Sequence, residues 1–329
     1  MKCHLATRVA EWRINMSENK ACRARKTSIG GQALIEGIMM RGPKLSAMAV
    51  RNTQGEIVLE KWENEPANKK KTVIDTFRKT PVIRGVFNFV STMISGYKSL
   101  MKSAEIAGFE DETEKEESKG TMAVVGVVAM VLGVLLSVGL FIFLPTFIYD
   151  LLSKIIPVFA GSRILKSVFE GVFKIAILVG YMAAVSRMND IKRTFQYHGA
   201  EHKTIFCYEA GLELTVENVR KQGRFHPRCG TSFLIVMLLV SIFVGMVIPP
   251  ELPTLVRTLV KLLLLPVTMG LGYEFIKFAG RHDGKIVKIL SAPGLWMQRI
   301  TVLEPTDDMI ECAIAAVNEV IPEDGSDLI

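Results

Sequence analysis

Cysteine is scarce in this chain and shows no pairing pattern. The 329 residues include five cysteines, an odd number spread along the sequence: Cys3, Cys22, Cys207, Cys229 and Cys312. A disulfide-stapled secreted domain carries more cysteines at closer spacing, so that class is excluded. We expect reduced thiols that face the cytosol.

The chain also lacks a secretory signal, a P-loop, a dinucleotide fingerprint and an RNA-binding signature. Its basic balance, 40 lysines and arginines against 33 acidic residues, gives a net charge of +7. Without a nucleic-acid motif, we interpret this charge as attraction to anionic lipid headgroups. Nucleic acid is therefore not an expected partner, and the lipid bilayer is.

What the chain has in abundance is apolar sequence. Hydrophobic residues make up 49% of it and charged residues 22%, with a mean hydropathy of +0.30. Four apolar runs approach or exceed the roughly 20 residues that cross a bilayer. They cover residues 121–149, 164–186, 231–250 and 255–273.

Two of these runs contain charged residues. Lys166, Glu170 and Lys174 lie four apart in the second run, and Arg257 and Lys261 lie near the start of the fourth. They either reach the outer ends of the spans or pair inside the bundle. The alternative is a functional polar track.

The loops predict the orientation. The connection between the second and third runs carries eight basic residues between Arg187 and Arg228, whereas the other short connections carry few. Basic short loops stay in the cytosol. We expect a multi-pass protein of the cell inner (cytoplasmic) membrane with both termini cytosolic.

The remaining segments predict a small soluble region. Residues 46–62 read as a β-hairpin, and residues 80–108 as an amphipathic helix, either on the membrane face or packed in a domain. Residues 282–290 and 297–305 look like short strands, and residues 306–320 like a capped helix.

The expected fold is an α-helical membrane protein with about four transmembrane helices and a small α+β cytosolic domain built from the N- and C-terminal segments. The predicted division is a basic extension (1–27), a cytosolic α+β segment (28–108), an acidic linker (109–120), helices 1 and 2 (121–186), a cytosolic loop (187–230), helices 3 and 4 (231–276) and a C-terminal α+β segment (277–329).

The loop holds the main candidate site, in the stretch "YHGAEHKTIFCYEAG" (197–211). A helix from Asn189 to Ala210, started by Asn189 or Asp190 and stopped by Gly211, places His198 and His202 one turn apart. Both imidazoles then reach one metal ion. Glu201 lies roughly 60° around the helix from His198, so the string matches the H-x-x-E-H arrangement of inverted zincins.

A zinc site needs a further ligand, and "QGRFHPRCGTSF" (222–233) supplies two candidates, His226 and Cys229. Cys207 lies on another helix face and His282 is a more distant option. Glu209 lies about 10 Å along the axis from His202, too far to share the ion.

A glycine-rich stretch, "IGGQALIEGIMMRGP" (29–43), precedes the hairpin. Such turns can present backbone N–H groups to a phosphate. The simpler interpretation is that its glycines allow tight turns and that Glu36 pairs with Arg41 or Arg84.

Five motifs in order, "GGQALIEGIMMRGP", "PVIRG", "YHGAEHKTIFCYE", "RFHPRCGTSF" and "PGLWMQRIT", resemble the YqhQ-like family of bacterial membrane proteins. The resemblance covers roughly residues 28–320. That family is a domain of unknown function often labelled a predicted metal-dependent enzyme. The resemblance implies a multi-pass membrane protein with a metal site.

Together these features predict a zinc-type hydrolase acting on a membrane-proximal protein or lipid. His198 and His202 are the expected ligands, completed by His226 or Cys229, and Glu201 is the expected general base. The alternative is a non-catalytic scaffold, regulator or small-solute carrier. The oligomeric state and the substrate have no signature in the sequence.

Overall fold

A computed structural model describes residues 26–64, 80–109, 119–159, 162–226, 229–281 and 284–328. The predicted N-terminal extension and acidic linker lie almost wholly outside these residues, as does His282. The part of the chain that is described is mostly helical, with one small sheet near its start.

The sheet is a four-stranded antiparallel meander in the order β1-β2-β3-β4. Its strands are β1 (Gly30–Leu34), β2 (Gly37–Arg41), β3 (Leu45–Arg51) and β4 (Ile57–Glu63). The β3–β4 hairpin confirms the prediction for residues 46–62. The glycine-rich stretch forms a second hairpin, β1–β2, that the sequence did not reveal.

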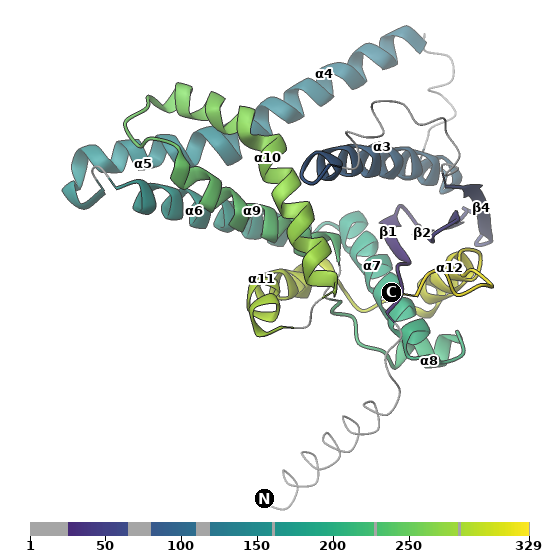
Figure 1. The fold of residues 1–329 in the computed structure, drawn as a ribbon. Coiled ribbons are helices and arrows are strands. Elements are labelled where there is room, and N and C mark those ends of the chain that lie inside the picture. The colour runs from purple at the N-terminus through teal and green to yellow at the C-terminus, as the bar shows by residue number, and fades with distance from the viewer. Residues whose placement is uncertain are drawn as a thin grey trace, which may run out of the picture.

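Helices cover both faces of this sheet (Figure 1). Strand residues alternate between faces, and one face buries Ile38, Met40 and Ala47 against α7 (Asn189–Glu209) and α12 (Asp307–Asn318). The opposite face carries Met39, Met48 and Val50, next to α3 (Ile83–Ile106). The predicted helices at 80–108 and 306–320 are both present.

The two ends of the described chain meet at this domain. Thr27 forms a β-bridge with Leu328, and the Thr27 hydroxyl donates to Asp327 over 2.6 Å. α12 packs on β2 and β3, so the N-terminal sheet is completed by the C-terminal helix.

Among the described residues, four helices are long and apolar enough to cross a membrane: Val131–Ile155, Arg163–Val185, Gly230–Val247 and Thr254–Phe278. They belong to α4 (Lys119–Val138) with η2 (Gly139–Phe143) and α5 (Leu144–Ile155), to α6 (Arg163–Val185), to α9 (Gly230–Val247) and to α10 (Thr254–Arg281). The number agrees with the four predicted runs. A π-turn, η2, precedes Pro145, whose missing N–H cannot continue a regular helix.

Several charged residues of these helices pair inside the bundle. The Glu170 carboxylate lies 3.2 Å from Arg257 Nε and 2.7 Å from Lys261 Nζ. Lys166 Nζ lies 2.5 Å from Asp150 Oδ1. The pairing interpretation therefore holds for these residues, because a buried charge requires a partner.

The two predicted C-terminal strands are wrong. Residues Lys285–Thr301 form one helix, α11, which packs against α9 and α6. Ile286, Ile289, Pro293, Met297 and Ile300 recur at helical rather than alternating spacing. Within the described residues, the segment after α10 is helical, not α+β.

Candidate metal centre

The histidines lie on α7, which runs beside the edge of the sheet. α7 ends as predicted, with Gly211 at φ +68° as its left-handed stop. Its start differs, since Met188 is the N-cap and neither Asn189 nor Asp190 caps it. The rings of His198 and His202 lie edge-on to each other one turn apart, with centroids separated by 4.5 Å.

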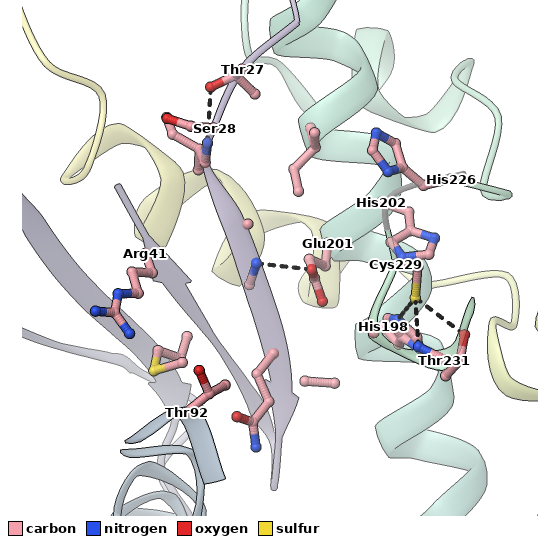
Figure 2. A pocket seen from close by; sticks show the side chains of 18 of the residues that line it. Thr27, Ser28, Arg41, Thr92, His198, Glu201, His202, His226, Cys229 and Thr231 are labelled. Carbon is pink, nitrogen blue, oxygen red and sulfur yellow. Dashed lines mark hydrogen bonds between the residues drawn. The ribbon is translucent and has the colours of Figure 1, made fainter. Parts of the chain in front are cut away.

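Cys229 joins this pair from the start of α9. His198, His202 and Cys229 place one ligand atom each within 4.8 Å of one another, and His198 Nε2 lies 3.1 Å from Cys229 Sγ. Figure 2 shows the three side chains gathered beside Thr231, whose backbone N–H donates to the sulfur over 3.4 Å. The positive end of a helix suits a negatively charged ligand.

Backbone carbonyls orient both imidazoles toward the sulfur. His198 Nδ1 lies 2.9 Å from the Thr301 carbonyl oxygen, and His202 Nδ1 lies 2.6 Å from that of Arg224. A carbonyl only accepts, so each Nδ1 carries a hydrogen, which leaves the Nε2 lone pair for a ligand. Metal-binding histidines are held in this way.

Burial favours the neutral form of His202. It lowers the pKa of His202, outweighing the nearby thiol of Cys229, and a neutral imidazole is the form that binds metal. Two imidazoles and a sulfur with bonds of about 2.0–2.3 Å match a zinc-type site. The residues present therefore fit a divalent ion.

Glu201 lies outside the ligand group, on the side toward β1 (Figure 2). Its carboxylate accepts a hydrogen bond of 3.0 Å from the Gly31 backbone N–H. Burial raises the pKa of Glu201, against the opposing effects of His198 and of that hydrogen bond. A Cβ at position 31 would lie 3.0 Å from the Glu201 carboxyl carbon, so glycine allows this close approach.

His226, the other expected ligand, is placed differently. Its Nε2 lies 3.6 Å from Glu209 Oε2, and its backbone exchanges hydrogen bonds with the Gln298 side chain. Glu209 accepts from the backbone N–H of Thr27 over 2.9 Å. His226 thus helps to hold the loop before α9, while Cys207 is buried on another face of α7.

The expected partners of Glu36 are wrong. Glu36 has φ +49° in the two-residue turn between β1 and β2, and its carboxylate binds Arg193 of α7 through two contacts of 2.5 Å. Arg84 pairs with Glu274 instead. The turn directs Glu36 toward α7, which is 157 residues away in sequence.

A cavity of about 820 Å³ opens beside the site. It lies between β1, α3, α7 and the start of α9, and the three ligand-group residues and Glu201 all line it. Gln32 of β1 and Thr92 of α3 also line it. A molecule in this cavity reaches both Glu201 and the ligand group.

Sequence reasoning missed the groups that orient the site. The carbonyls of Thr301 and Arg224 and the N–H of Gly31 belong to the backbone, which carries no residue signal. Of these three residues, only Gly31 was marked by the sequence, as part of the glycine-rich stretch.

Comparisons with known proteins agree with the resemblance seen in the sequence. Residues 80–323 match the family described as "Protein of unknown function (DUF1385)". The chain is 37% identical over 304 residues to "Uncharacterized protein YqhQ" of Bacillus subtilis (strain 168), covering 89% of this chain and 92% of that protein. No solved structure matches the chain. The chain therefore belongs to the DUF1385 family of YqhQ-like proteins.

Proposed function

We propose that this protein is a membrane-bound, metal-dependent hydrolase whose centre is formed by His198, His202 and Cys229. The observation that carries the proposal is the orientation of both imidazoles by backbone carbonyls. It leaves two Nε2 lone pairs and one sulfur converging beside a cavity.

The donor set favours a borderline-soft ion such as zinc, since two imidazoles and a thiolate suit it better than magnesium or calcium. Three protein ligands leave one position open, the arrangement of catalytic rather than structural zinc. When bound, such an ion polarises a carbonyl group and lowers the pKa of water.

Glu201 supplies the proton transfers. Burial raises its pKa above the ordinary value, which makes the carboxylate a stronger base. Glu201 takes one proton from a water molecule while the water oxygen bonds to the carbonyl carbon of the substrate. Glu201 then returns that proton to the leaving nitrogen or oxygen as the bond to carbon breaks. The products are a carboxylic acid and an amine or alcohol.

The basic loop that carries the site supports a position on the cytosolic side. Arg187, Lys192 and Arg193 follow directly on α6, and basic residues are retained in the cytosol. The substrate bond is then a peptide, amide or ester bond at the inner membrane surface.

Metal analysis of detergent-purified protein tests the proposal. We expect about one zinc per chain in the wild type, a loss of at least about tenfold in metal affinity for His198→Ala, His202→Ala and Cys229→Ala, and retained metal in His226→Ala. Equal metal contents in all five proteins would favour the non-catalytic scaffold or carrier instead.

Glu201→Gln separates a catalytic site from a structural one. This variant keeps the accepting oxygen for Gly31 N–H, so it is expected to fold and to hold the ion. Its hydrolytic rate should fall at least about 10²-fold, the contribution of a positioned general base. An unchanged rate would remove Glu201 from the chemistry.

A further inference from the structure

Strand β1 is an edge strand, and its free edge borders the cavity. β1 pairs with β2 alone among the strands. Residues 29–33 line the cavity together with His198, Glu201 and Cys229. Figure 2 shows β1 and the Glu201 carboxylate side by side.

The register shows which backbone groups point to the cavity. Leu34 and Gly37 flank a two-residue turn and therefore exchange both hydrogen bonds, after which the pairing alternates. Gly30, Gln32 and Leu34 bond β2, whereas Gly31 and Ala33 direct their N–H and C=O groups outward. The bond from Gly31 N–H to Glu201 agrees with this pattern.

Three of the outward groups have no hydrogen-bond partner within the described part of the chain. Among the residues that the structure describes, none bonds the N–H or C=O of Ala33 or the C=O of Gly31. Gly30 and Gly31 are exposed, and Ala33 is half-buried. An antiparallel chain beside Ala33 exchanges both of its hydrogen bonds there.

The two edges of the sheet differ in chemistry. β4, the opposite edge, carries Glu60, Lys61 and Glu63, charges that discourage another strand from pairing. β1 reads Gly-Gly-Gln-Ala-Leu, small and uncharged where it meets the cavity. The edge without charged residues is thus the one next to the candidate metal centre.

We propose that a segment of a protein substrate binds in extended form along β1 as a fifth strand. This assignment rests on the proposed function and narrows it to peptide-bond hydrolysis. A chain paired with Ala33 passes Gly31 two residues further on, about 6.6 Å away. Gly31 N–H holds Glu201, so a peptide bond near this point faces the general base.

The cavity has room for such a segment. Its volume of about 820 Å³ lies within the roughly 300–1,000 Å³ of typical ligand sites. Main-chain pairing supplies affinity with little dependence on sequence, and the cavity walls select alternate side chains.

A binding measurement on the full chain in lipid nanodiscs tests the assignment, in a Glu201→Gln background that prevents turnover. The probe is a mixed-sequence library of acetylated octapeptides, read by mass spectrometry of retained peptides. A matched library with N-methylated backbone amides serves as the control, because N-methylation blocks strand pairing. Ala33→Pro removes the outward N–H, and Ala33→Ser retains it.

We expect Ala33→Pro to weaken peptide affinity by at least about tenfold relative to Ala33→Ser, and the N-methylated library to bind equally weakly. Proline is tolerated on an edge strand whose N–H faces outward. If Ala33→Pro does not fold, the comparison of the two libraries on the Ala33 protein decides.

Equal binding of the two libraries would overturn the assignment. Lysophospholipid is offered as a separate probe, and its retention in the absence of any retained peptide would also overturn the assignment. Metal content of the same samples keeps the two proposals apart. If peptide binding depends on the β1 edge but the protein holds no metal, only the hydrolase proposal is contradicted. If the protein holds metal but peptide binding does not depend on that edge, only the assignment of β1 is contradicted.

Discussion

Gly199 lies directly against the main-chain carbonyl of Leu303, and a Cβ atom at position 199 would be 1.9 Å from that oxygen. Glycine inside a helix costs about 1 kcal/mol relative to alanine. Here it allows residues 301–303 to cross α7, where Leu303 N–H donates to the Phe195 carbonyl over 2.9 Å. The same crossing brings the Thr301 carbonyl to His198.

Gly199→Ala should therefore destabilise the protein by about 1–3 kcal/mol, the typical cost of overpacking, and weaken zinc binding by displacing Thr301. Thermal unfolding in nanodiscs and zinc affinity are the measurements. Gly180→Ala on α6 is the control, because a Cβ there meets nothing within 4 Å. Equal losses of stability and zinc affinity in the two variants would contradict a close contact between Gly199 and the Leu303 carbonyl.

Cys229 should be protected from alkylation by zinc. Its sulfur lies in the ligand group beside the cavity. Cys207 and Cys312 are internal references, since burial raises the pKa of both thiols, that of Cys312 to about 11. In a variant with Cys3 and Cys22 replaced by serine, mass spectrometry after iodoacetamide treatment should find Cys229 modified in metal-free protein.

Added zinc should slow that modification by at least about tenfold, because a coordinated thiolate is not free to react. His198→Ala should abolish the protection. Modification of Cys229 at the same rate with and without zinc would contradict its role as a ligand.

Glu304 ties the loop before α9 to α7. Its carboxylate accepts from Lys203 and, over 3.0 Å, from Arg224. Partial burial alone would raise its pKa, but the two cations outweigh burial and lower it below the ordinary 4.5. The folded state therefore gains stability from ionised Glu304 above pH 4.5, and this gain is lost as the pH falls through the lowered pKa.

Since the Glu304 side chain is 56% exposed, its replacement by glutamine should cost only about 0.5–1 kcal/mol at pH 7. Unfolding midpoints of wild type and variant should converge as the pH falls below 4.5. A stability difference between the two proteins that widens as the pH falls would contradict a lowered pKa of Glu304.

Glu170 is the shared partner of two cations in the bundle, Arg257 and Lys261, and it also accepts from Thr146. Arg257 is fully buried. Glu170→Gln leaves both cations without a counter-charge, so we expect a loss of about 3–5 kcal/mol in stability. Thermal unfolding in nanodiscs measures it.

Glu251→Gln is the matched control for Glu170, because Glu251 is exposed. Its effect should stay within about 0.5 kcal/mol. A Glu170→Gln protein as stable as this control would indicate that the cluster serves the polar track instead of the packing of the bundle.

The sequence predicted the features that depend on local pattern. The four apolar runs, the β3–β4 hairpin and the end of α7 at Gly211 follow from run length, alternation and a glycine. The proximity of Cys229 to His198 and His202 was one of several alternatives. Only the folded structure distinguishes Cys229 from His226 as the third member of the group, because the His226 side chain lies next to Glu209 instead.

What the sequence could not supply depends on tertiary contacts. The β1–β2 turn at Ile35 and Glu36 lacks the Asn-Gly or Asp-Gly signal of a tight hairpin. The sequence of α11 predicts strands because short apolar runs fit the spacing of a strand as well as that of a helix. The packing of this segment on α9 favours the helix. The carbonyls that orient the histidines carry no signal in any side chain.

Cobalt(II) titration of metal-free protein tests the metal centre most directly, because cobalt reports the identity and geometry of its ligands through its absorption. We expect saturation at one ion per chain, visible d–d bands of tetrahedral intensity and a near-ultraviolet thiolate-to-cobalt band. Cys229→Ser should lose the thiolate band, and His202→Ala should lose the tetrahedral spectrum. A weak octahedral spectrum that is the same in wild type and in both variants would contradict the account.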